Sequence, residues 1–369
     1  MGNIGDVARR PSGEGNGRTY SRPCDNSAMD VTMKDIAEEL GVSIGTVSKV
    51  LRDHPDISPE TRQRVRKRMK ELNYRPNLTA RALVTGRTYS IGFIVPDLVH
   101  PFFGEVARGL SRVLRKKGYN LIISSSEEDQ ELERRGIDQL LARRVDALIP
   151  ASSEKDAGSL RHLENQKTPY ILIDRRPAGL QTNFIGVDDE EIGILAAQHL
   201  IDMGCRLIAH ISGPAISTAL GRLKGYQRAL HRHGLSVDSK YVITRDHGDE
   251  KSDRSGYQAM KKLLTLERPP DGVFCYNDPT AMGAMEAALE HGLRIPRDLA
   301  VVGAGNVRYA SFLRMTTIDQ QCEDIGDRAG KLALRLIESK AAPKLQTILL
   351  KPRLIVRQSS SKRSLPPNT

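Results

Sequence analysis

The sequence lacks features that would point to a membrane or metal-dependent protein. It has no apolar run long enough to span a membrane, so we expect no membrane-spanning helix. Its few cysteines lie far apart, with no CxxC or Cys/His spacing for zinc, and we interpret them as free thiols in a reducing cytoplasm. These cysteines are Cys24, Cys205, Cys275 and Cys322.

Acidic residues are outnumbered by basic ones. The chain has 56 Lys and Arg against 45 Asp and Glu, which gives a formal charge of +11. This excess favours a polyanionic partner, and by itself it would suit DNA, RNA or an anionic membrane surface equally. The length of 369 residues predicts two or three domains, each with a sizeable core.

Residues 1–30 contain scarcely any apolar side chain. They are rich in Gly, Ser, Arg, Asn and Pro and lack the hydrophobic core of a signal peptide. We therefore expect a disordered extension on a cytoplasmic protein, and a second disordered tail at 359–369. A basic arm with weak DNA contacts is an alternative for residues 1–30, and Met29 is an alternative start of the chain.

A compact helical unit is predicted for residues 31–75. Ile36 and Ala37 lie on one helical face, Gly41 permits a tight corner, and Val47 and Val50 form the facing stripe. This is the spacing of a helix-turn-helix. Residues 43–52 would then be the recognition helix, capped by the hydroxyl of Ser43, with its first turn facing base edges in the major groove.

A third helix follows with a clear start. Ser58 is a predicted N-cap, Pro59 occupies the first helical position, and Val65 and Met69 recur at helical spacing. The polar face is strongly basic, which suits contacts to DNA phosphates. A merely solvated charged helix is the alternative. The basic residues are Arg62, Arg64, Arg66, Lys67, Arg68 and Lys70.

Several motifs resemble one known family. DIAEELGVSIGTVSKVL, followed by ISPETRQRV, ELNYRPN and ARAL, is similar to the headpiece of the lactose-repressor/galactose-repressor (LacI/GalR) family of bacterial transcription regulators. IGFIVPDLVHPFF, VFCYNDPTAMGAMEAALEHGLRIPRDLAVVG and TTIDQ resemble the same family's effector-binding core. The resemblance covers all but about the first thirty and last ten residues. It is specific, because several motifs fall in the family's order and spacing.

The resemblance implies a set of DNA contacts and a hinge. Residues 76–88 match a hinge helix and linker that fold only with a partner hinge and DNA. Leu83 matches a residue that wedges between base steps in the minor groove, although an ordinary core leucine is the alternative. The implied DNA-binding residues are Thr32, Ser43, Ile44, Gly45, Thr46, Ser48, Lys49, Arg52, Asn77, Ala80 and Leu83.

From residue 89 to 358, apolar strand-like runs alternate with amphipathic helices. This alternation predicts an α/β core of two doubly wound parallel sheets that meet near Asp188. Two later runs, TTIDQ and ILLKPRLIVRQ, should cross back between the lobes. The resemblance implies the two-lobed periplasmic-binding-protein-like fold, with the ligand in the cleft at the carboxyl ends of the strands.

Side chains at those strand ends form the predicted effector site. Phe102 and Phe103 follow the first strand and suit stacking on a ring, while core packing is the alternative for one of them. The guanidinium of Arg222 suits a carboxylate, a phosphate or several hydroxyls. The full set implied by the resemblance is Phe102, Phe103, Asp174, Arg222, Asn277, Asp278, Asn306 and Gln320.

One segment departs from the family pattern. Where VVGFDD or VVGYDD is common, this chain has VVGAGN, so Ala304, Gly305 and Asn306 replace an aromatic residue and one or two acids. The loss of an acceptor carboxylate beside Arg222 favours a sugar acid or sugar phosphate over a simple sugar. The recognition helix also departs, with Ile44 and Gly45 where polar base-reading side chains are common.

The sequence therefore predicts a transcription regulator, most simply a repressor, that binds a pseudo-palindromic double-stranded DNA operator under control of a small effector. A homodimer rather than a tetramer is expected, because the tail has no leucine heptads for a tetramerising coiled coil. No catalytic residue, cofactor, metal or membrane partner is predicted. The alternatives are a solute-binding protein of a transport system, which would need a signal peptide, and a carbohydrate-active enzyme, which would need a catalytic pair.

Overall fold

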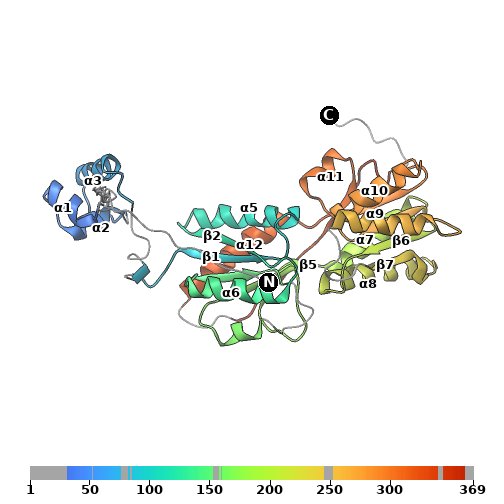
Figure 1. Cartoon of the computed structure of the whole chain (residues 1–369), viewed down its shortest axis with the longest axis horizontal. Coiled ribbons are helices and arrows are strands. Elements are labelled where there is room, and N and C mark those ends of the chain that lie inside the picture. The colour runs from blue at the N-terminus through green and yellow to red at the C-terminus, as the bar shows by residue number, and fades with distance from the viewer. Residues whose placement is uncertain are drawn as a thin grey trace, which may run out of the picture. The chain divides into compact units, whose positions relative to one another are not determined.

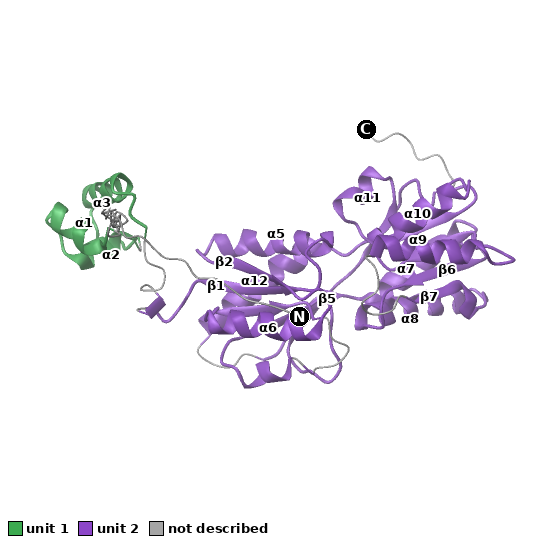
Figure 2. Cartoon of the chain, in the orientation of Figure 1, with its two compact units in different colours: residues 1–77 green, residues 78–369 purple. Residues whose placement is uncertain are grey.

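The computed structural model describes residues 31–51, 53–75, 82–83, 85–152, 158, 160–244, 252–339 and 344–361. The chain divides into two compact units, residues 1–77 and 78–369 (Figure 2). The predictions made for residues 1–30, for most of the hinge and for residues 362–369 of the tail lie outside the described residues. The predicted start of the disordered tail at residue 359 is wrong, because Ser359 and Ser360 are buried and hydrogen-bond to Val301 and Thr316 of the second lobe.

Unit 1 contains three helices, α1 (Met33–Leu40), α2 (Ile44–Leu51) and α3 (Pro59–Glu71) (Figure 1). Gly41 takes a φ of 64° at the corner between α1 and α2, as the sequence predicts. The buried core is small and comes from all three helices: Ile36, Ala37, Val47, Val50 and Val65.

The ends of these helices are satisfied by side chains. Ser58 accepts a hydrogen bond from the Thr61 backbone N–H at the start of α3, which confirms the predicted cap. Thr32 and Asp35 form a reciprocal capping box at the start of α1, which the sequence analysis did not find. Caps matter here because a five-residue core alone gives a unit of this size little stability.

Unit 2 contains two lobes, each built on a largely parallel sheet (Figure 1). The first lobe has strand order β2-β1-β3, joined by the Leu148–Tyr170 bridge to β4-β5-β11. The second has order β7-β6-β8-β9-β10-β12, with β12 antiparallel to β10. The strands are β1 (Ser90–Val95), β2 (Asn120–Ser125), β3 (Ala147–Pro150), β4 (Ile171–Ile173), β5 (Asn183–Val187), β6 (Ile208–Ser212), β7 (Val242–Thr244), β8 (Gly272–Cys275), β9 (Ala300–Gly305), β10 (Thr316–Asp319), β11 (Thr347–Leu350) and β12 (Arg353–Ile355).

Helices cover both faces of these sheets. In the second lobe Phe274 packs in one hydrophobic cluster with α7 and α8, while its neighbours Val273 and Cys275 pack in another with α9 and α10. Successive strand residues point to opposite faces, so both faces are buried, as the apolar runs predict. The helices are α5 (Pro101–Arg115), α6 (Gln130–Ala142), α7 (Asp189–Asp202), α8 (Ser217–Arg232), α9 (Ser252–Leu264), α10 (Asp278–Glu290), α11 (Arg308–Phe312) and α12 (Cys322–Glu338), with short 3-10 helices at Arg161–Asn165 and Ser239–Tyr241.

Three helix pairs touch through reciprocal glycines. A Cβ added at Gly109 of α5 would lie 2.2 Å from the Glu323 carbonyl of α12, and one at Gly326 of α12 would lie 2.1 Å from the Val106 carbonyl of α5. The pairs α7–α8 and α9–α10 repeat this arrangement. Any larger residue at these positions would push the helix backbones apart. The other glycines are Gly193 with Gly225 and Gly256 with Gly283.

The chain passes between the lobes three times. The first passage lies between β5 and α7, at the predicted position of Asp188; the second joins β10 to α12, which packs on α5 in the first lobe; the third joins β11 to β12. The thiols of Cys205, Cys275 and Cys322 are buried and form no disulfide. Among the described helices, none combines the length and apolar character needed to cross a membrane.

Candidate functional site

The first turn of α2 carries most of the predicted base-reading residues. The Ser43 hydroxyl accepts from the Thr46 backbone N–H at 3.0 Å and shares a 2.9 Å hydrogen bond with the Thr46 hydroxyl. Ile44 is exposed, and Gly45 leaves open space beside it. The ammonium of Lys49 lies 3.5 Å from a carboxylate oxygen of Asp56 on the loop after α2.

Some of the remaining predicted DNA contacts lie on described residues, and others do not. Ser48 lies on the half-buried flank of α2, and the Thr32 side chain is engaged in the cap of α1. Leu83 is helical and 80% exposed, so it belongs to no apolar core in unit 2. The predictions for Arg52, Asn77 and Ala80 lie outside the described residues.

The arginines of α3 are largely paired within unit 1. Arg62 donates to the Asp53 carboxylate at 2.9 Å, and Arg66 binds the same carboxylate. Arg68 bonds Glu39 and donates to Glu71 at 3.0 Å. These bonds fix α3 against α1 and the α2–α3 loop. The basic stripe that the sequence assigned to phosphates therefore also has structural partners, which come from segments that helical periodicity does not reveal.

A cavity of about 510 Å³ lies between the lobes of unit 2, and residues from both lobes line it. Six of the predicted effector residues are present in its wall. They are Phe102, Phe103, Asp174, Arg222, Asn277 and Gln320.

Arg222 is held by protein groups on all sides. Its Nε donates to Asp189 Oδ1 at 2.9 Å, and its Nη1 and Nη2 donate to the Tyr276 carbonyl at 2.6 Å and to Gln320 Oε1 at 3.1 Å. The guanidinium also lies over the Tyr276 ring, 4.7 Å from its centroid. Burial raises the pKa of Asp189 to about 7, while the Arg222 charge acts in the opposite direction. Three of the five N–H groups of the guanidinium are thus already donated to protein acceptors.

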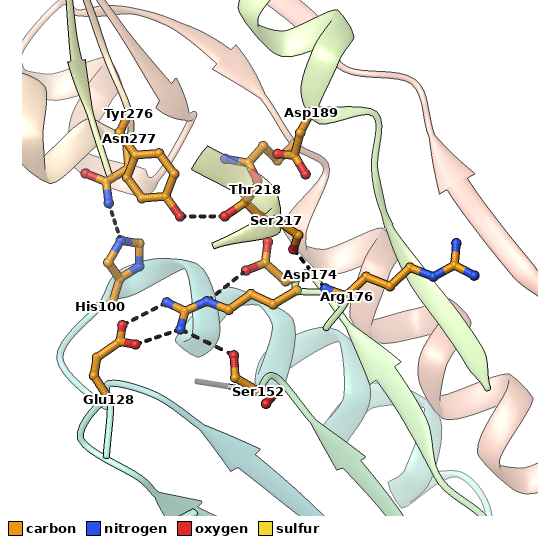
Figure 3. Close-up of polar contacts among 12 residues, drawn as sticks. His100, Glu128, Ser152, Asp174, Arg176, Asp189, Ser217, Thr218, Tyr276 and Asn277 are labelled. Carbon is orange, nitrogen blue, oxygen red and sulfur yellow. Dashed lines mark hydrogen bonds and ion pairs between the residues drawn. The ribbon is translucent and has the colours of Figure 1, made fainter. Parts of the chain in front are cut away.

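A second buried ion pair lies across the cavity in the first lobe (Figure 3). Arg175 donates to the two carboxylate oxygens of Glu128 at 2.7 and 2.8 Å. Asp174, at the end of β4, has a φ of 60° and approaches the Arg175 guanidinium only to 3.9 Å. Burial raises the pKa of Asp174. Among the described residues, the 3.9 Å ion pair with Arg175 is the contact that this carboxylate makes, and its oxygens can still accept hydrogen bonds.

His100 and Asn277 form a hydrogen bond between the lobes (Figure 3). The Asn277 carbonyl oxygen accepts from Thr280, so its amide nitrogen is the group that donates to His100 Nε2, at 3.0 Å. Burial lowers the pKa of His100 to about 4, so the ring is neutral and its proton is on Nδ1. His100 Nδ1 and Arg175 Nε are buried donors without a hydrogen-bond partner among the described groups.

Further contacts hold the lobes together away from this pair. The Arg176 backbone N–H donates to the Ser217 hydroxyl at 2.9 Å (Figure 3). At the other end of the cleft, the Arg308 backbone N–H donates to the Glu105 carboxylate at 3.1 Å. Hydrogen bonds therefore join the two lobes at three places in the described conformation.

Two predicted effector residues lie behind the wall. The buried Asp278 carboxylate accepts from the Thr317 hydroxyl at 2.5 Å and from the Val307 backbone N–H at 2.9 Å, and burial raises its pKa to about 6. Asn306 accepts from Arg357 Nη2 at 2.8 Å. Both side chains tie together loops of the second lobe, and neither lines the cavity.

The sequence analysis missed several residues of the wall. Glu128 follows β2 and Arg175 follows Asp174, so the strand-end rule that found Asp174 applied to both of them. Tyr276 directly precedes the predicted Asn277, and His100 lies two residues before the predicted Phe102. Among the described residues there is no cluster of His, Cys, Asp and Glu that could hold a metal ion.

Comparisons with known proteins match both units. A family model described as bacterial regulatory proteins of the lacI family matches residues 32–77, and one for a periplasmic binding protein-like domain matches residues 197–360. The chain is 33% identical to catabolite control protein A of Priestia megaterium over 337 residues, which cover 90% of this chain and 100% of that protein.

Solved structures agree with this likeness. The lac repressor dimer bound to operator and the anti-inducer ONPF is 28% identical, with a TM-score of 0.78, and the match covers 89% of this chain and 99% of that one. A complex of the transcriptional regulator CelR with cellobiose is also 28% identical, with a TM-score of 0.67 and coverage of 89% and 100%.

Proposed function

The chain belongs to the LacI family of bacterial regulatory proteins, so it is a DNA-binding transcription regulator, and we propose that it is a repressor controlled by a small molecule bound between its lobes. The observation that carries this proposal is the cavity of about 510 Å³, whose wall comes from both lobes of a chain that also has a helix-turn-helix. A ligand that contacts both lobes binds one lobe orientation better than others, and this differential affinity is what drives a switch.

The wall of the cavity favours an uncharged, hydroxyl-bearing effector. It contains four carboxylates, those of Asp97, Glu127, Glu128 and Asp174, against the two guanidiniums of Arg175 and Arg222. Both guanidiniums already bind protein carboxylates, so the expectation of a sugar acid or sugar phosphate loses its basis. An anion entering this cavity would lose hydration and face an excess of negative charge.

Unpaired hydrogen-bonding groups in the wall suit hydroxyls in particular. Asp174 offers acceptor oxygens, while His100 Nδ1 and Arg175 Nε offer buried donors. A hydroxyl group both donates and accepts, so a ring that carries several hydroxyls can satisfy these groups together. Phe102 and Phe103 supply apolar wall for the ring itself. We therefore propose a neutral carbohydrate-like effector, in keeping with the cellobiose complex of the similar regulator.

The proposed working form is a homodimer in the bacterial cytoplasm. The similar lac repressor binds its operator as a dimer, and two headpieces match the two halves of a pseudo-palindrome. We expect light scattering to give twice the chain mass of 40.9 kDa, and a mass four times that of the chain would contradict this assignment. The similar proteins are transcription regulators, which favours neither a transport protein nor an enzyme.

Two variants separate the two halves of the proposal. Asp174→Asn keeps the shape of a wall residue whose carboxylate makes only a long 3.9 Å ion pair with Arg175, so effector binding should weaken at least tenfold while operator affinity without effector stays unchanged. Leu83→Ala removes the proposed minor-groove wedge and should weaken operator binding by a similar factor, with effector affinity retained.

The measurements are operator binding by fluorescence anisotropy and ligand binding by thermal shift. Operator DNA is obtained by selection from random sequences with full-length protein. The ligand panel comprises ribose, glucose, galactose and cellobiose, with gluconate and glucose 6-phosphate as acidic counterparts. Stabilisation by the acids alone would refute the neutral class, and Asp174→Asn with parental effector affinity would refute the site.

A further inference from the structure

The first turn of α2 presents an apolar side chain to solvent. Ile44, the first residue of α2, is 47% exposed and is absent from the buried cluster that forms the core of unit 1. That core takes its α2 contribution from Val47 and Val50, which lie further along the helix than Ile44. Single exposed apolar residues are common on protein surfaces, so the place of Ile44 in the helix-turn-helix, rather than its exposure alone, indicates what it can contact.

The neighbours of Ile44 leave it as the outward-reaching group of that turn. Ser43 and Thr46 bond each other through their hydroxyls. Gly45 has no side chain, and a Cβ placed there would meet only the Ser43 hydroxyl at 3.4 Å. Val47 is buried. The first turn therefore offers a branched apolar surface bordered by a gap.

In a helix-turn-helix the first turn of the second helix faces base edges in the major groove. Those edges consist of hydrogen-bonding groups with one apolar exception, the C5-methyl group of thymine. We propose that Ile44 selects a thymine in each operator half-site by packing against this methyl group. The proposal rests on the DNA-binding function stated above and adds the base that one residue reads.

Uracil tests the proposal because it differs from thymine only by the methyl group. With the operator selected for full-length protein, each thymine of a half-site is replaced by uracil in both halves at once. One position should weaken binding about tenfold, which corresponds to the loss of one buried methyl contact per half-site. The other thymines serve as internal controls.

The matched protein variants are Ile44→Ala and Ile44→Val. Ile44→Ala should bind the thymine and uracil operators equally at the sensitive position, whereas Ile44→Val should retain part of the discrimination. Leu132→Ala shortens an exposed apolar side chain on α6, far along the chain from the helix-turn-helix, and should behave like the parent. Circular dichroism checks that each variant is folded.

Three outcomes would overturn the inference. The parent would discriminate against uracil at no position, or Ile44→Ala would keep the parental discrimination, or the selected operator would contain no thymine in its half-sites. A selection that enriches no sequence at all would contradict sequence-specific DNA binding itself, and with it this reading of Ile44.

Discussion

The ion pairs of unit 1 and those in the cleft of unit 2 lie in different surroundings. In unit 1 the side chains of Arg66 and Asp53 are 56% and 63% exposed, whereas in the cleft of unit 2 those of Arg222 and Asp189 are 4% and 17% exposed. Exposed pairs exchange partners with water at little cost. Buried pairs cannot be broken without leaving an uncompensated charge.

This difference matches what each unit must bind. The basic side chains of α3 can leave Asp53 or Glu39 for a DNA phosphate, because water already competes for them. The guanidiniums of Arg175 and Arg222 are held in the cleft by bonds to neighbouring carboxylates. A charged residue at a predicted site therefore has to be interpreted with its partners.

The largest expected effect tests the buried pairs directly. Arg222→Met removes three donated hydrogen bonds and leaves Asp189 buried without a counter-charge, so unit 2 should lose about 3–5 kcal/mol of unfolding free energy in urea denaturation. The matched control is Arg228→Met on the same helix, where the arginine is half exposed and pairs with Glu190. Equal losses in the two variants would remove the distinction between buried and exposed pairs.

A somewhat smaller effect extends the comparison from charge to packing. In α5, Gly109→Ala would bring a Cβ to 2.2 Å from the Glu323 carbonyl, which forces α5 and α12 apart and should cost unit 2 about 2–3 kcal/mol. Gly104 lies on the same helix with no neighbour within 4 Å. Gly104→Ala should therefore stabilise the protein by up to about 1 kcal/mol, because alanine favours helices. Calorimetry of both variants decides the point.

Acid should reveal how burial of the His100 ring in the cleft affects the stability of unit 2. The pKa of His100 is lowered to about 4 by burial, from about 6.5 in the unfolded chain, so its contribution to stability is complete above pH 6.5 and is lost as the pH falls towards 4. Between pH 7 and pH 5 the parent should lose about 1–2 kcal/mol more than His100→Gln, whose amide oxygen can still accept from Asn277. Parallel pH profiles of thermal unfolding would contradict this assignment.

The smallest effects are expected in unit 1. Ser58→Ala removes the cap of α3 and should cost about 1 kcal/mol. Arg68→Met breaks only exposed pairs with Glu39 and Glu71 and should change stability less than the cap variant does. Hydrogen exchange of residues 31–75 in the full-length protein measures both. A larger loss for Arg68→Met would mean that the surface pairs, rather than the caps, hold the unit together.

Local signals predicted the elements of this protein well. Apolar runs identified the strands, and the Ser58-Pro59 start identified α3, because these signals come from residues close in sequence. The rule that ligands bind at the carboxyl ends of parallel strands, together with the family resemblance, predicted Asp174, Asn277 and Gln320 at the cavity, and all three line it.

The errors concern contacts made across the fold. Asp278 directly follows Asn277, yet it turns towards Thr317 and away from the cavity, and the sequence does not reveal that partner. The pairing of Arg175 with Glu128 depends on how the strand ends of the first lobe come together. Strand periodicity specifies which residues lie at an edge, but the direction of each side chain depends on distant segments.

The three passages of the chain between the lobes have a mechanical consequence. Two rigid bodies joined by one tether can adopt almost any mutual orientation, whereas three neighbouring tethers leave little more than rotation about a single axis. The helix pairs locked by reciprocal glycines make each lobe stiff, so deformation concentrates in the tethers. A bound molecule therefore has to bias only one angle, and that angle is the signal that leaves the cleft.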